Sequence, residues 1–270
     1  MEAFLSGLYV RNLLYTMALM ICLWLISLKT KDASIMDIFW GPCFILVAWL
    51  TFFMAEGFWG RKLLVAFLVT LWGLRLAIHI ATRNIGKGED RRYRAWRTKY
   101  GNRFWWISFF TVFFVQGILL WVISLGFQTV QMSSLPEKFV WLDALGCAVW
   151  AVGLLFEVLG DWQLKRFRSE PNSQGKVMDR GLWAYTRHPN YFGESLIWWG
   201  IFLISLTNIS HFWTVISPLV MTFLLVRVSG VALLERDISE RRPEYQAYIR
   251  GTSAFVPWFP KKDRDLKKRT

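Results

Sequence analysis

Seven long, nearly uncharged apolar blocks dominate this chain and limit the folds that it can adopt. Each block is about 20 residues long, which matches a bilayer core of roughly 30 Å crossed by a helix at 1.5 Å per residue. Apolar residues make up 54% of the 270 residues, more than a soluble domain of this size can bury. We therefore predict an all-α, polytopic membrane protein with seven transmembrane helices. The predicted spans are residues 7–27, 35–55, 63–82, 107–127, 139–160, 190–207 and 212–234.

The basic residues are distributed unevenly between the predicted loops. Of the 32 Lys and Arg, 26 lie in the segments that seven spans would place on one side of the membrane, namely 28–34, 83–106, 161–189 and the tail after 234. The positive-inside rule predicts that this side is cytoplasmic and that the N-terminus is outside. Because this placement accounts for the net charge of +13, we expect membrane lipids as partners and no nucleic acid.

No repeat or low-complexity linker divides the chain. We predict one helical membrane domain over residues 1–260 and a frayed basic tail over 261–270. The first apolar block lacks a basic leader and a small-residue cleavage site, which favours a first span over a signal peptide. The three cysteines lie inside apolar blocks and show no metal-ligand spacing, so no metal site is expected.

Residues 180–194, RGLWAYTRHPNYFGE, form a polar and aromatic block at the start of the sixth predicted span. Unsatisfied polar groups cost several kcal/mol in lipid, so this block indicates a function. Asn190 is expected to cap the helix, and a capped N-terminus beside Arg187 and His188 suits a phosphate group. Tyr191 and Glu194 are the other polar side chains of this block that we consider candidates for binding. The simpler alternative is a helix cap with interfacial aromatic residues.

Ionisable residues inside predicted spans are further functional candidates, because burying them in lipid is costly. Asp37 lies in the second span, and Arg75 and His79 lie one helical turn apart in the third. Arg227 and Glu235 lie in or at the end of the seventh.

A fourth group of charges follows one face of the helix that leaves the fifth span. Glu157, Asp161, Lys165 and Arg168 have the spacing i, i+4, i+8 and i+11. Such a row is either an ion-paired surface ladder or a polar face that receives a cofactor, with acids at ribose hydroxyls and bases at phosphates. The chain has no G-x-G-x-x-G, Walker or H-E-x-x-H motif, which excludes a Rossmann fold, a P-loop nucleotidase and a zinc protease of that type.

The C-terminal hundred residues carry the motifs of a known family. The run Asp161…Lys165…Arg168, the stretch GLWAYTRHPNYFGE and the tail pattern LLER…YQAY…FVP resemble the steroid 5α-reductase-like superfamily. The bacterial branch of membrane proteins with a domain known as DUF1295 is the most similar. It also matches DIFWG in the second span and RNIGKGED after the third. The resemblance covers roughly residues 35–260.

This resemblance implies a seven-helix fold in the bacterial inner (cell) membrane, NADPH on the cytoplasmic side and reduction of an activated, enone-type C=C bond in a lipid or steroid-like substrate. It places cofactor contacts on Asp161, Lys165, Arg168, Tyr185, Asn190 and Glu194. From the charge and position of the residues alone, we add further candidate cofactor contacts. These are Arg83, Asn84 and Arg91 of the basic loop, Arg187, His188 and Tyr191 of the polar block, and Arg227 and Glu235. NADPH brings four negative charges, which suits a strongly positive face.

The chain departs from the family at the catalytic positions. Steroid-reducing members polarise the ketone with a Gln-Glu pair in the second span and a Tyr near the third. Here the second span offers only Asp37 as an internal acid, and the third-span counterpart is Trp72. We therefore take Asp37, Arg75, His79 and Glu194 as candidate catalytic residues, each of which must reach the substrate within hydrogen-bond distance to act.

Two other classes of function stay open. The Arg-His-Pro-Asn-Tyr unit is also similar to isoprenylcysteine carboxyl and phospholipid methyltransferases, which bind S-adenosylmethionine. Those enzymes carry a Glu-Glu pair where this chain has Glu235-Arg236, and this chain has the Asp161–Arg168 row that suits a dinucleotide. A lipid-binding or scaffold membrane protein is the third alternative. The sequence leaves the oligomeric state open, a monomer included.

Overall fold

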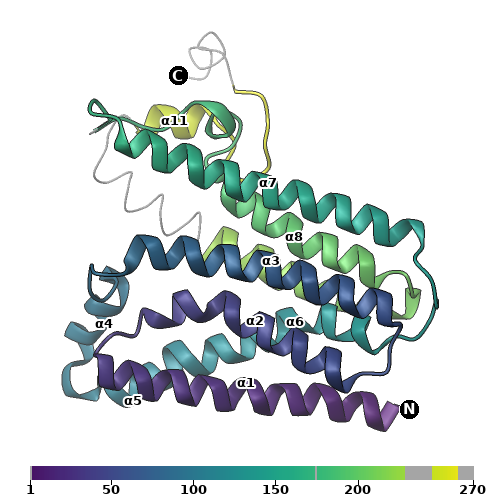
Figure 1. The fold of residues 1–270 in the computed structure, drawn as a ribbon. Coiled ribbons are helices and arrows are strands. Elements are labelled where there is room, and N and C mark those ends of the chain that lie inside the picture. The colour runs from purple at the N-terminus through teal and green to yellow at the C-terminus, as the bar shows by residue number, and fades with distance from the viewer. Residues whose placement is uncertain (1, 174, 229–244, 261–270) are drawn as a thin grey trace. The chain divides into compact units, whose positions relative to one another are not determined.

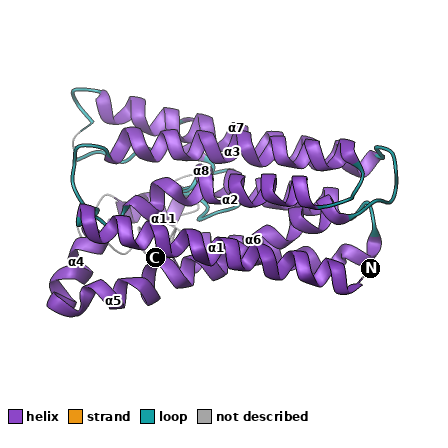
Figure 2. Cartoon of the chain, turned by 60° about the horizontal axis from the view of Figure 1, so that its bottom comes forward, coloured by secondary structure: helices purple, strands orange, loops and turns teal. Residues whose placement is uncertain are grey.

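A computed structural model of the chain describes residues 2–173, 175–228 and 245–260. Every regular element within these residues is a helix, which confirms the all-α fold class (Figures 1 and 2). Six helical stretches of the described chain are long and apolar enough to cross a membrane. The predicted span at 190–207 is not among them, because the helix there, α8 (Pro189–Ser205), has 17 residues and a length of roughly 25 Å. The seventh crossing stays a prediction.

The chain forms two compact units. The first comprises Met1–Trp141 with Ser205–Ser217, and the second comprises Leu142–Ile204 with Pro218–Thr270. The first unit contains the candidates of the second and third spans, and the second contains the polar block at 180–194.

The first unit is a bundle of long helices with a short helical segment at one end (Figure 1). Its elements are α1 (Glu2–Thr30), α2 (Ile35–Met54), α3 (Trp59–Asn84), α4 (Arg91–Tyr100), the 3₁₀ turn η1 (Gly101–Arg103), α5 (Phe104–Ser108), the π-helical turn η2 (Phe109–Phe114), α6 (Val115–Met132) and the 3₁₀ helix η4 (Ile209–Val215). From α4 to α6 the chain is one continuous helical stretch, which contains the predicted span at 107–127.

α2 and α3 approach each other closely because glycine occupies the contact on both sides. A Cβ atom added to Gly41 would lie 2.3 Å from the carbonyl oxygen of Gly73, far inside van der Waals contact. Next to this contact Phe44 meets Trp72 edge to face, with ring centroids 5.5 Å apart, and both rings are buried. Trp72 is therefore a core residue of the first unit.

A buried chain of hydrogen bonds joins α1 to α2 and α6. The Asn12 amide donates to Thr51 Oγ1 and to Gln128 Oε1, both at 2.8 Å. Gln128 Nε2 in turn donates a hydrogen bond to Ser124 Oγ at 2.6 Å. Hydrogen bonds between polar side chains help to hold helices together in a membrane, because the hydrophobic effect does not drive helices to associate in lipid.

The second unit is built on two long helices. Its elements are α7 (Trp141–Ser169), the 3₁₀ turn η3 (Gly181–Ala184), α8, most of α9 (Ile216–Phe223), the π-helical turn η5 (Leu224–Val228) and α11 (Tyr245–Gly251). α7 and α8 run side by side (Figure 1), with facing glycines at two levels seven residues apart. A Cβ atom on Gly193 would lie 2.4 Å from Gly153 O, and one on Gly200 would lie 2.6 Å from Gly146 O. The two backbones therefore touch at both levels.

Candidate functional site

The polar block lies at the start of α8, in the second unit. The helix begins at Pro189, whose fixed φ and missing N–H suit the first helical position. Asn190 is thus the second residue of α8, and the prediction that it caps the helix is wrong. The physical reason is that Pro189 takes the first helical position, so Asn190 lies within the first turn, where its Nδ2 donates to Asp161 Oδ1 at 3.1 Å.

The Asn190–Asp161 hydrogen bond joins two residues that the sequence analysis placed in one site. It brings the first turn of α8 against the part of α7 that carries the row of charges ending at Arg168. Asn190 Oδ1 is buried and has no hydrogen-bond partner within the described residues. Because an unsatisfied buried carbonyl costs free energy, this oxygen is an open acceptor for a ligand donor.

The turn before α8 is held against α7 by a glutamine and a tryptophan that the sequence analysis did not single out. Gln163 Oε1 accepts a bond from Leu182 N at 3.0 Å. Trp183 Nε1 donates to Gly160 O at 3.0 Å. Gly181, with a φ of +62°, makes the tight approach possible, because a Cβ there would lie 2.7 Å from the Gln163 carboxamide.

Arg187 has a structural role in this unit. It is 7% exposed, and its Nη1 donates to the carbonyl oxygens of Ile249 at 2.9 Å and Thr252 at 2.6 Å. Arg187 N donates to Ser253 O at 2.9 Å, and Trp258 N donates to Tyr185 O at 2.9 Å. Residues 249–258, called here the C-terminal strap, are thus bound along the block 185–187. The neighbouring His188 is buried and stacks on Tyr191 with centroids 5.5 Å apart.

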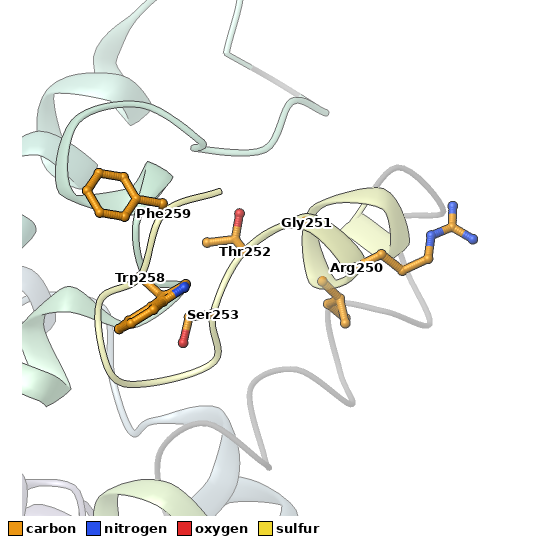
Figure 3. Close-up of a pocket in the computed structure, with 7 residues that line it drawn as sticks. Arg250, Gly251, Thr252, Ser253, Trp258 and Phe259 are labelled. Carbon is orange, nitrogen blue, oxygen red and sulfur yellow. The ribbon is translucent and has the colours of Figure 1, made fainter. Parts of the chain in front are cut away.

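The C-terminal strap encloses a surface hollow of about 260 Å³ (Figure 3). It is lined by Ile249, Arg250, Gly251, Thr252, Ser253, Trp258 and Phe259. The Arg250 side chain extends away from Trp258 in Figure 3. None of the predicted site residues within the described ranges lines this hollow.

The other predicted cofactor residues of the second unit are spread over several elements. Lys165 and Arg168 are exposed on the last turns of α7, and Glu194 is half-buried in α8. Tyr185 is 43% exposed, and its ring meets Phe259 edge to face at 6.1 Å. Arg227 is exposed in η5. Glu235 lies outside the described residues.

A second polar cluster lies in the first unit, around the predicted acid Asp37. This carboxylate accepts a bond from Tyr93 Oη at 2.8 Å and from Arg92 Nη2 at 2.6 Å. Gln116 Nε2 of α6 lies 3.5 Å from the same phenol oxygen. Tyr93 is 5% exposed. The cluster therefore holds a buried phenol against a carboxylate, and the single hydroxyl hydrogen of that phenol is donated to Asp37 Oδ1.

The loop before α4 fixes this helix on the start of α2. Asp90 caps α4 by accepting from Arg92 N at 2.9 Å. Glu89 accepts two bonds from Arg97, at 2.7 and 2.8 Å, and one from Ala33 N at 2.9 Å. Burial acts to raise the pKa of Glu89, but the bonds from Arg97 and Ala33 outweigh it, so the pKa lies below its usual value.

Acid is therefore expected to weaken the first unit through Glu89. Because its folded pKa lies below the unfolded value near 4.5, the carboxylate contributes fully to stability above that pH. The contribution is lost as the pH falls through the folded pKa. Thermal unfolding between pH 6 and pH 3 measures this. Glu89→Gln should lower the melting temperature at pH 6 and reduce its fall in acid, whereas an unchanged acid profile would assign the loss to other carboxylates such as Asp90.

The remaining predictions of the first unit fall near this cluster in the sequence. Arg75 and His79 lie one turn apart on α3, both half-buried. At the end of that helix Arg83 Nε donates to Asn84 Oδ1 at 3.1 Å, and Asn84 Nδ2 is a buried donor with no partner within the described chain. Arg91 is exposed at the first position of α4.

Tyr93 and Arg92 are the site residues that the sequence analysis missed. Both lie in a basic-aromatic segment whose composition indicates a surface. The available signal was the spacing of Tyr93, Arg97 and Tyr100 on one face of α4, the face that the structure turns away from solvent.

The fold and the two clusters define a helical membrane protein with buried polar groups at helix ends. The chain belongs to the family described as protein of unknown function (DUF1295), whose model matches residues 23–252. It is also 24% identical over 279 aligned positions to an uncharacterised protein of Schizosaccharomyces pombe, an alignment that covers 92% of this chain and 79% of the relative. No solved structure matches the chain significantly.

Proposed function

We propose that this protein is an NADPH-dependent membrane reductase that acts on an activated, enone-type C=C bond of a lipid or steroid-like substrate. The observation that carries the proposal is the hydrogen bond between Tyr93 and Asp37. Reduction of a conjugated C=C bond requires a group that donates to the carbonyl oxygen or protonates the α-carbon. Methyl transfer to an oxygen or nitrogen nucleophile has no such requirement, so this pair favours the reductase over the methyltransferase.

The residues of the second unit fit a dinucleotide by their chemistry. Asn190 Oδ1 is a buried acceptor with no partner within the described residues, and it would take an amide or hydroxyl donor. Lys165 and Arg168 are exposed cations on the same helix as Asp161, and they would hold phosphate groups. When bound, NADPH would supply the hydride.

In the first unit, Tyr93 would turn its single hydroxyl hydrogen from Asp37 Oδ1 to the substrate carbonyl as negative charge develops there. Asp37 orients the phenol through its Oδ1, while Arg92 holds Oδ2 of the same carboxylate. These two bonds to the same carboxylate fix the position of the phenol ring. The side of the membrane that carries the basic loops would be the cytoplasmic side of a bacterial inner membrane, and the N-terminus would be outside.

Ligand-dependent stability tests the proposed cofactor. Thermal unfolding of the purified protein should shift upward with NADPH, since a ligand at 100 times its Kd stabilises by about 2.7 kcal/mol. Asn190→Ala and Arg168→Ala should lose most of this shift. The matched controls are Asn172→Ala and Arg166→Ala, exposed residues of the same unit, which should retain it. Stabilisation by S-adenosylmethionine alone would overturn the reductase in favour of the methyltransferase.

A further inference from the structure

α4 and α5 form a two-faced segment at the end of the first unit where α1 ends and α2 begins (Figures 1 and 2). One face is anchored: Tyr93 and Arg92 bond to Asp37, and Arg97 bonds to Glu89 while its guanidinium lies 4.5 Å above the Phe104 ring. The sequence of α4, RRYRAWRTKY, is too polar to cross a bilayer. It lies at the level where the long apolar helices of this unit end.

The stretch from residue 83 to residue 103, which includes α4, has a large excess of basic over acidic residues. Eight Lys and Arg fall between residues 83 and 103, with only two acids among them, Glu89 and Asp90. Both acids are engaged by arginines of α4. Lys99 and Arg103 remain on the exposed side.

Exposed tryptophans accompany these cations. Trp96, Trp105 and Trp106 are 41%, 55% and 44% exposed. Trp105 is held in place, since its carbonyl accepts a bond from Trp24 Nε1 of α1 at 2.8 Å and the two indoles stack. Tryptophan is enriched at the headgroup level of a membrane, where its ring is apolar and its N–H is polar.

We propose that the outer face of α4 and α5 binds anionic phospholipid headgroups and that this binding holds α4 on α2. Lys99 and Arg103 supply charge for the phosphates, and the three tryptophans lie among the headgroups beside them. In a zwitterionic headgroup such as phosphatidylcholine the phosphate charge is offset by the choline cation, so the surface favours headgroups with a net negative charge.

This lipid site is coupled to the phenol–carboxylate pair, because one ten-residue helix carries both. Arg92 and Tyr93 are the second and third residues of α4, and Lys99 is the ninth. A lipid that fixes the outer face therefore also fixes Tyr93 against Asp37. Anionic lipid would thus activate the protein, a consequence that rests on the proposed function, whereas lipid binding itself does not.

Amide hydrogen exchange of the full-length protein in nanodiscs tests the site without any activity. Exchange over residues 91–100 should be several-fold slower in discs that contain phosphatidylglycerol than in discs of phosphatidylcholine alone. Lys99→Gln/Arg103→Gln should weaken binding of phosphatidylglycerol by about 30-fold, at about 1 kcal/mol for each of the two charges, and should abolish the difference. The control Lys138→Gln/Lys176→Gln removes two cations outside this segment and should behave as the wild type.

Equal exchange in the two lipids, or an equal loss in the control variant, would overturn the lipid site. Enone reduction is measured on the same discs as a separate readout. Slower exchange without any reduction by wild-type protein would retain the lipid site and refute the reductase. Reduction that is equally fast in both lipids would refute the coupling.

Discussion

Replacing Tyr93 with phenylalanine is expected to lower enone reduction by about 10²- to 10⁴-fold, the range that a positioned acid contributes. The variant loses only the hydroxyl, and the phenyl ring keeps its edge contact with Trp96 at 6.0 Å. Loss of the buried hydrogen bond to Asp37 should cost on the order of 1.5–3 kcal/mol of stability, so folding is checked alongside the rate. The measurement is the rate of substrate-dependent NADPH oxidation by purified protein in lipid, together with the stabilisation by NADPH.

Tyr100→Phe is the matched control, since it removes a phenol from the same helix without touching Asp37. It should retain the wild-type rate. Asp37→Asn should also reduce the rate, because an amide cannot hold both Tyr93 and Arg92 as a carboxylate does. Wild-type turnover in Tyr93→Phe, with NADPH stabilisation unchanged, would remove Tyr93 from the reaction and leave the cofactor site untouched.

Gly193→Ala is expected to destabilise the second unit by on the order of 2 kcal/mol or more, despite the better helix propensity of alanine. The added Cβ would lie 2.4 Å from Gly153 O and 2.7 Å from Glu157 N. Backbone atoms cannot move aside as a flexible side chain can, so α8 must shift away from α7. Thermal or denaturant unfolding in detergent measures the loss.

Gly7→Ala is the matched control for this substitution. It also lies in a long apolar helix, but a Cβ there meets no atom within 4 Å. Helix propensity alone should then act, and stability should stay the same or rise by up to about 1 kcal/mol. Equal stability of the two variants would show that α7 and α8 separate at little cost.

The helices were predictable because their signal is physical and local. A run of about 20 apolar residues has few structures available in lipid, and α1, α2 and α3 lie where the apolar blocks fall. α8 shows the limit of this argument: its apolar run ends at Ser205, and 17 residues do not establish a crossing. Length and hydropathy predict a helix there, while the crossing depends on more than sequence composition.

The candidate sites were predictable only in part, because side-chain partners come from distant segments. Asn190 was expected to cap its own helix, since capping is the local option for an asparagine beside an apolar run. Its actual partner, Asp161, lies 29 residues earlier. Asp37 was singled out as a buried acid, but Tyr93 was not, because 56 residues separate the two and only the fold brings them together.

The C-terminal strap imposes an order on the biogenesis of the second unit. Arg187 is buried, and the carbonyl groups that receive its guanidinium belong to Ile249 and Thr252, more than 60 residues later in the chain. While the ribosome is still translating that interval, the arginine lacks these two acceptors. The start of α8 can therefore reach its final form only after the strap has been synthesised, so premature termination before residue 249 should yield a chain that cellular quality control removes.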